Sequence, residues 1–252
     1  MTAPIPRDIP DLPALPRPPH RLPAPVPATA VVAPVHRPLA ALFRLLTALT
    51  AAAGVALELL LGSPARTLSY FSVQAGILLA VVMLSSASRA WRTRRPLPAS
   101  VTGAALLYAL IAALTYHLLL AHATPPFTMT GAAPPPARWH AQWTALQLLH
   151  TVAPLAALLD WLLLTPAARL HLRNAVTWLL YPLAYLVFYL TQAAFLPSST
   201  PSRYLYPFLD AQTHGYRDTL ANALLIGLAI YAVAVLLVTL DHVRPSPVRH
   251  RG

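Results

Sequence analysis

The apolar segment at residues 68–87 contains a serine whose hydroxyl could act as a nucleophile. Helical spacing places Ser69, Ser72, Gly76, Ala80 and Met83 on one face. Small residues at this spacing allow a neighbouring helix to approach closely. They could equally leave a pocket open beside the serine. The face is therefore either a helix contact or a pocket wall, and in the second case Ser72 and Gly76 are candidate site residues.

A second polar group lies in the apolar segment at residues 141–164. Hydrogen-bonding side chains recur there at spacings of four, three and four residues, at His140, Thr144, Gln147 and Thr151, with His150 beside them. Polar side chains in an apolar helix are costly without partners, so we expect this face to point into the protein. His150 is either a hydrogen-bonded helix contact or a reactive group, and Gln147 and Thr151 are candidate pocket residues.

Aromatic and amide side chains mark the last two apolar segments. Tyr185, Tyr189 and Gln192 continue a helical stripe that begins at Trp178, and Asn222 lies near the start of the final segment. The stripe can be aromatic packing, or it can be the wall of an acyl-chain pocket. In the second interpretation Tyr185, Tyr189, Gln192 and Asn222 are candidate pocket residues.

Six long apolar segments position these residues, at about 39–61, 68–87, 99–121, 141–164, 174–196 and 218–240. Each is close to the length of about 20 residues that a helix needs to cross a hydrocarbon core, and the backbone within lipid must bond to itself. We predict an all-α polytopic membrane protein with a six-helix transmembrane bundle. Its domains are a proline-rich disordered tail at 1–37, the transmembrane domain at 38–241 and a basic tail at 242–252.

Two prolines interrupt the predicted helices. Pro154 and Pro182 lack the N–H groups that would bond to the carbonyls of His150 and Trp178. A freed carbonyl within a bilayer needs a packed partner or a wet cavity. We therefore expect a kink and one of these two solutions at each proline.

The composition agrees with a membrane protein. Of the 252 residues, 57% are hydrophobic and 10% are charged, and the mean hydropathy is +0.57. A soluble domain carries about 25% charged residues, so a soluble single-domain enzyme is excluded. The chain has no cysteine, which excludes disulfides and thiolate chemistry. We predict no metal site and no cofactor.

The arginines predict the orientation. The net charge of +11 could indicate a nucleic-acid partner, but the arginines lie in tails and connections, so we predict none. Thirteen arginines belong to the tails and to the second and fourth connections, against four in the other connections. The positive-inside rule then predicts a multi-pass protein of the cell membrane with both termini cytoplasmic.

Four short motifs together resemble a known family: SYFSVQ at 69–74, LHTVAP at 149–154, DWLL at 160–163 and LYPFLD at 205–210. Their order over residues 40–240 is similar to that in actinobacterial six-helix membrane proteins related to the androgen-induced FAR-17a family. Animal members of that family are threonine hydrolases that cleave fatty acid esters of hydroxy fatty acids. The resemblance implies the same fold and a lipid-ester substrate.

The resemblance also implies roles for two residues. The family's nucleophilic threonine corresponds to Ser72, and its catalytic histidine corresponds to His150. His150 would take the Ser72 proton during attack on the ester carbonyl, and water would then hydrolyse the acyl-enzyme. Glu58, Asp210 and Asn222 are possible orienting residues.

Two alternatives remain at the sequence level. A non-enzymatic lipid-binding or structural membrane protein with the same fold is favoured by Ala75 and Gly76, because bacterial relatives often carry serine and asparagine there. Haem could be bound through His150 together with His117 or His122. Membrane lipids are the expected partners of both the hydrolase and the lipid-binding protein. The sequence predicts no particular protein partner.

Overall fold

The computed structural model describes residues 37–123, 126–130, 135–197, 200 and 203–245, which belong to one unit spanning Val35–Gly252. The predicted proline-rich tail, apart from Arg37, and most of the predicted basic tail lie outside these residues. The described residues form helices and connections, and none of them lies in a β-strand. Six helices among them are long and apolar enough to cross a membrane, so the all-α six-helix prediction is confirmed.

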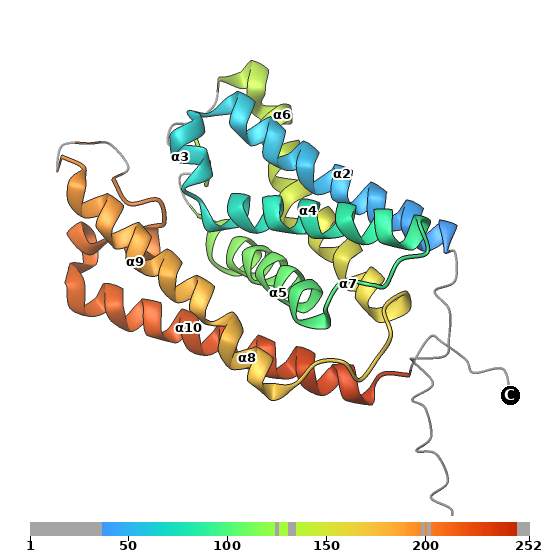
Figure 1. The fold of residues 1–252 in the computed structure, drawn as a ribbon. Helices are drawn as coiled ribbons and strands as arrows, with labels where there is room; N and C mark the ends of the chain where they lie inside the picture. The colour runs from blue at the N-terminus through green and yellow to red at the C-terminus, as the bar shows by residue number, and fades with distance from the viewer. Residues whose placement is uncertain (1–36, 124–125, 131–134, 198–199, 201–202, 246–252) are drawn as a thin grey trace, which may run out of the picture. The chain divides into compact units, whose positions relative to one another are not determined.

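The spans are defined as follows (Figure 1). The first three are α2 (Pro38–Leu61), α4 (Phe71–Trp91) and Ala99–Leu120, which joins α5 (Ala99–Thr115) to a π-helical turn at Tyr116–Leu120. The fourth, Pro136–Leu163, contains α6 (Trp139–Gln147), a π-helical turn at Leu148–Val152 and α7 (Ala153–Leu163). The fifth consists of α8 (Leu172–Trp178) and α9 (Leu180–Phe195), and the sixth is α10 (Ala211–Val243). A short helix, α3 (Pro64–Leu68), connects α2 to α4.

Contacts between helix ends show that successive spans run in opposite directions. The Arg37 amide donates to the Ala90 carbonyl at 3.5 Å, so the start of α2 lies beside the end of α4. Arg44 forms an ion pair with Asp160 at 2.7 Å, which places the end of α7 there as well. We call this the arginine end of the bundle, and the opposite end the Ser72 end.

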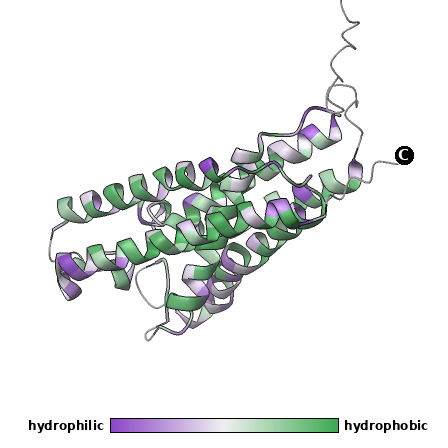
Figure 2. Ribbon diagram, turned by 90° about the horizontal axis from the view of Figure 1, so that it is seen from below, coloured by the Kyte–Doolittle hydropathy of each residue, from purple (hydrophilic) through white to green (hydrophobic). Residues whose placement is uncertain are grey.

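The outer surfaces of the helices are apolar. Hydrophobic residues run along the helices, while hydrophilic residues gather mostly at helix ends and connections (Figure 2). Leucines of α9 and α10 are the clearest case, because Leu180 is 66% exposed and Leu225 is 63% exposed. An apolar surface of this kind fits a hydrocarbon environment. The chain is accordingly a multi-pass integral membrane protein.

A polar clamp fixes the end of α10 at the arginine end. Asp241 is 1% exposed and accepts a hydrogen bond from the Leu170 amide at 2.9 Å. It also pairs with Arg244 at 2.7 Å. The Arg244 guanidinium donates to the carbonyls of Thr165 at 2.9 Å and Pro166 at 3.1 Å. The clamp therefore ties α10 to the connection between the fourth and fifth spans.

The helix break near Pro182 is satisfied by packing. The fifth span divides at Leu179, between α8 and α9. The Trp178 carbonyl, which has no partner N–H at Pro182, accepts a hydrogen bond from the Tyr108 hydroxyl at 2.8 Å. Gly103 permits this approach, since a Cβ there would lie 2.7 Å from the Trp178 ring. Of the two solutions expected for a freed carbonyl, this site uses a packed partner.

The sixth helix begins earlier than predicted. Asp210 caps it, because its side chain accepts hydrogen bonds from the amides of Gln212 at 2.8 Å and Thr213 at 3.2 Å. Gly215, with a φ of 77°, then breaks the helical path near its start. Asp210 therefore fixes a helix end, and it is not among the residues that line the cavity described below.

Candidate functional site

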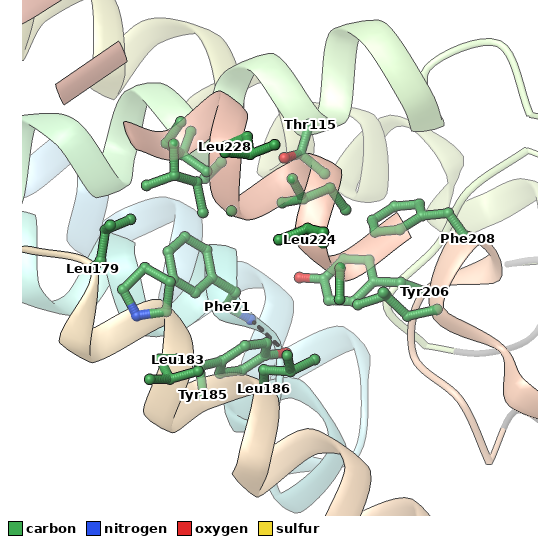
Figure 3. A pocket seen from close by; sticks show the side chains of 18 of the residues that line it. Phe71, Thr115, Leu179, Leu183, Tyr185, Leu186, Tyr206, Phe208, Leu224 and Leu228 are labelled. Carbon is green, nitrogen blue, oxygen red and sulfur yellow. Dashed lines mark hydrogen bonds between the residues drawn. The ribbon is translucent and has the colours of Figure 1, made fainter. Parts of the chain in front are cut away.

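A cavity of about 740 Å³ lies between α4 and α5 on one side and α9 and α10 on the other (Figure 3). Pockets of about 300–1,000 Å³ hold small molecules. Apolar side chains form most of the lining, and Figure 3 shows Leu183 and Leu186 of α9 facing Leu224 and Leu228 of α10 across it. The lining residues with side-chain polar atoms are Ser72, Thr115, His150, Tyr185, Tyr206 and Tyr231.

The cavity opens at the apolar outer surface of the helices. Several lining residues are also exposed at the outer surface, with Leu183 59% exposed, Leu224 65% exposed and Leu228 56% exposed. A residue that both lines a cavity and lies at the surface marks its mouth. The mouth is therefore formed by apolar side chains of α9 and α10.

Ser72 lies in the first turn of α4 and is 6% exposed. The chain reaches it through α3 and an extended Tyr70, so the N-terminal end of α4 points at the cavity. The Phe71 amide donates to the Tyr185 hydroxyl at 3.2 Å, and that hydroxyl donates to the Ser69 carbonyl at 2.8 Å. Tyr185 thus fixes the position of the turn that carries Ser72.

Two further polar contacts hold α9 against this turn. The Tyr181 hydroxyl donates to the Gln74 side chain at 2.6 Å, and the Gln192 amide donates to the Ser69 hydroxyl at 2.9 Å. The aromatic stripe of the fifth span is therefore a packing surface with specific hydrogen bonds. One of its members, Tyr185, also lines the cavity.

His150 is 2% exposed and lies in the π-helical turn of the fourth span. Its Nδ1 lies 3.0 Å from the Leu146 carbonyl, and its ring stacks on Tyr116 with centroids 4.5 Å apart. A carbonyl can only accept, so Nδ1 carries the proton and a neutral ring has its lone pair on Nε2. Both stacked residues belong to π-helical turns, which are frequent at functional sites.

Tyr206 reaches the cavity from the connection between α9 and α10. It is 6% exposed, and its ring packs edge-on against Tyr70 at 5.5 Å and stacks on Phe208 at 5.3 Å. Its hydroxyl oxygen accepts a hydrogen bond from the Ser72 side chain. Burial raises the pKa of the Tyr206 phenol, and this hydrogen bond offsets part of the rise.

The structure brings three of the nine predicted site residues to the cavity, namely Ser72, His150 and Tyr185. The other six are absent from its lining: Gly76, Gln147, Thr151, Tyr189, Gln192 and Asn222.

Close packing explains the place of Gly76, where a Cβ would lie 2.5 Å from the Leu149 side chain. Gly76 therefore forms a helix contact, the first of the two interpretations. Asn222 donates to the Phe208 carbonyl at 2.9 Å, and so supports the connection that carries Tyr206. The Tyr189 hydroxyl lies 3.5 Å from the Tyr206 carbonyl and supports the same connection.

The prediction that the polar stripe of the fourth span points inward is wrong at its start. His140 and Thr144 are exposed, and Gln147 and Thr151 are half-buried. Thr151 donates to Gln147 at 2.8 Å and lies 3.0 Å from Nε2 of His117. A π-helical turn adds one residue to a helical turn, so it rotates the faces before and after it relative to each other.

Gln142, which the sequence analysis did not single out, holds a buried position instead. Its amide nitrogen donates to both carboxylate oxygens of Glu58, at 3.0 Å and 3.2 Å, and Glu58 is 0% exposed. Glu58 does not line the cavity. It therefore joins α2 to α6 and is not placed to orient His150.

The histidines considered for haem are not gathered at the cavity, because His150 lines it and His117 and His122 do not. Among the described residues, no group of three or more His, Asp or Glu side chains is placed to hold a metal ion.

The fold and the cavity together define the class of this chain as a six-span membrane protein with an apolar cavity that opens at its outer surface. Comparisons with protein-family models, with curated proteins and with solved structures give no match.

Proposed function

We propose that this membrane protein hydrolyses a lipid ester, with Ser72 as the nucleophile and His150 as the general base. One observation carries the proposal. Residues from two different spans, both nearly buried, line the same apolar cavity. They are also the two positions that match the nucleophile and the histidine of the androgen-induced hydrolase family, although that relationship is itself part of the proposal.

The reaction follows from the chemistry of the two side chains. Oγ of Ser72 attacks the ester carbonyl carbon while Nε2 of His150 takes the hydroxyl proton. The tetrahedral intermediate then expels the alcohol, which receives that proton from His150. Water then attacks the acyl-serine while His150 takes one of its protons, and His150 returns that proton to Oγ of Ser72 as the carboxylic acid leaves.

The local structure prepares both groups for these roles. The hydrogen bond from Nδ1 to the Leu146 carbonyl leaves the lone pair on Nε2, which is the form a general base requires. Ser72 lies at the N-terminal end of a helix, where the partial positive charge of the helix favours a developing anion.

The shape of the cavity supports a lipid as the substrate. Its mouth between α9 and α10 is apolar, and its polar lining atoms belong to a few side chains that include Ser72 and Tyr206. An acyl chain would lie along the leucines while its ester group lies at Ser72. Entry from the bilayer avoids the cost of moving the chain through water.

Replacement of the nucleophile tests the function. We expect Ser72→Ala to abolish hydrolysis of long-chain acyl esters by the purified full chain in detergent micelles, and to abolish labelling by a fluorophosphonate probe. Ser86→Ala is the matched control, because Ser86 is also buried in α4 but lies outside the cavity lining. Its activity and labelling should equal those of the unmodified protein.

Non-enzymatic lipid binding is the second candidate, favoured by the largely apolar lining. An unmodified protein that binds acyl lipids, reacts with no fluorophosphonate and cleaves no ester would support it and overturn the hydrolase. Hydrolysis that persists in Ser72→Ala would reject Ser72 as the nucleophile.

A further inference from the structure

We propose that Tyr206 is a catalytic residue of this site and donates the hydrogen bond that stabilises the oxyanion formed when the ester is attacked. The inference rests on the proposed hydrolase function. It concerns a residue to which neither composition nor helical spacing assigned any chemistry, and it follows from the hydroxyl groups at the start of α4.

The first step of the argument is position. Ser72 and Tyr206 line the same cavity, and the Tyr206 oxygen accepts a hydrogen bond from the Ser72 hydroxyl. In the tetrahedral intermediate, Oγ of Ser72 and the oxyanion are bonded to the same carbon. The Tyr206 hydroxyl, which contacts Oγ before the reaction, is therefore within a small shift of the oxyanion.

The second step is the availability of a proton. Two tyrosine hydroxyls, those of Tyr185 and Tyr206, lie at the start of α4, and Figure 3 shows both beside Phe71. The Tyr185 hydroxyl donates to the Ser69 carbonyl at 2.8 Å, and this uses its single proton. Tyr206 has no such backbone acceptor among its described contacts, so its proton is the one that can turn to a substrate oxygen.

The third step is preorganisation, since a fixed donor lowers a barrier more than a mobile one. The Tyr206 ring is held between Tyr70 and Phe208. Its backbone amide lies 3.4 Å from the Tyr189 hydroxyl, and Asn222 binds the next turn of the connection through the Phe208 carbonyl at 2.9 Å. The hydroxyl is thus positioned from α9 and α10 before a substrate arrives.

The protonation state fits the role. Burial raises the pKa of the Tyr206 phenol, so the group keeps its proton at neutral pH and remains a hydrogen-bond donor. The N-terminal end of α4 adds its partial positive charge on the same side of Ser72.

The test uses Tyr206→Phe in the full chain, assayed with a chromogenic acyl ester in detergent micelles. Loss of one oxyanion donor lowers kcat by about 10²–10³-fold. We expect that loss in kcat with little change in KM, and slower but complete fluorophosphonate labelling of Ser72. The phenylalanine keeps the ring contacts with Tyr70 and Phe208.

Tyr204→Phe is the matched control. Tyr204 lies in the same connection and its ring contacts Tyr189 at 6.3 Å, but it does not line the cavity. Its kcat and KM should equal those of the unmodified protein.

Other outcomes separate the inference from the function. An unchanged kcat in Tyr206→Phe, or a raised KM alone, overturns the role of Tyr206 while Ser72-dependent hydrolysis stands. Hydrolysis that survives Ser72→Ala overturns the function itself. If Tyr206→Phe does not fold, 3-fluorotyrosine at position 206 replaces it, since a more acidic phenol should change kcat, and an unchanged kcat would reject the inference.

Discussion

At the residue scale, the partners that orient the imidazole of His150 among the described residues carry no charge. A backbone carbonyl at 3.0 Å fixes its Nδ1, and the Tyr116 ring covers one face. In many hydrolases a carboxylate orients the catalytic imidazole by accepting a hydrogen bond from its Nδ1. Here the two acidic residues considered for it are used elsewhere, since Glu58 pairs with Gln142 and Asp210 caps α10.

His150→Gln measures the contribution of the base. We expect hydrolysis and fluorophosphonate labelling to fall by about 10²–10⁴-fold, because proton transfer by a positioned base contributes that much. His242→Gln is the matched control. His242 makes the same ring contact with a carbonyl four residues earlier, at 2.8 Å, but it lies near the arginine end.

Equal activity of His150→Gln and His242→Gln would remove His150 from the mechanism. A loss in both variants that is accompanied by a lower melting temperature would instead assign the effect to stability.

Single residues of the site differ in how well the sequence predicts them. Ser72 and His150 stand out because a polar group within an apolar helix is costly, and both line the cavity. Tyr206 belongs to the LYPFLD motif, but no role follows from that motif, because only the three-dimensional path of the chain brings this tyrosine to Ser72. Gly76 illustrates the reverse, since small residues beside a serine suit a pocket and a helix contact equally.

At the element scale, length and apolarity predict the helices well, because a bilayer leaves the backbone few other structures. Local irregularities are not predicted. The π-helical turn before Pro154 depends on tertiary packing, and it rotates the polar stripe of the fourth span so that His140 is exposed. The helix start at Ala211 depends on the Asp210 cap, which lies outside the apolar segment.

The sixth helix offers a test of the acyl-chain cavity. Gly227 lines the cavity, and a Cβ added there would meet no atom within 4 Å. We expect Gly227→Leu to fill part of the space and lower kcat/KM for long-chain esters about tenfold or more, while short-chain esters are cleaved nearly as before. Activity against a series of esters of increasing chain length measures the effect.

Ala232→Leu serves as the comparison for that series, because Ala232 is exposed on α10 and does not line the cavity. An identical chain-length profile in both variants would show that the acyl chain does not occupy the space beside Gly227.

At the scale of the whole molecule, orientation in the membrane is predicted by the arginines alone. Because the chain has no cysteine, single cysteines can report on it without background. Ser63 is exposed near the Ser72 end, and Thr93 is exposed near the arginine end. We expect a membrane-impermeant maleimide to label Ser63→Cys in intact cells and Thr93→Cys only after permeabilisation. The reverse pattern would place the Ser72 end in the cytoplasm.

The clamp of Asp241 and Arg244 bears on how the molecule is assembled during biosynthesis. The partners of the connection at residues 164–170 lie at the end of the sixth span, so this connection can form its contacts with them only after the sixth span has been made. One wall of the cavity, from Leu220 to Tyr231, likewise belongs to the sixth span and is made after the other five spans. In a nascent chain of five spans, the cavity would therefore lack one wall and be exposed to the bilayer. The sixth span would complete this wall, and the clamp would then join the end of α10 to the connection between the fourth and fifth spans.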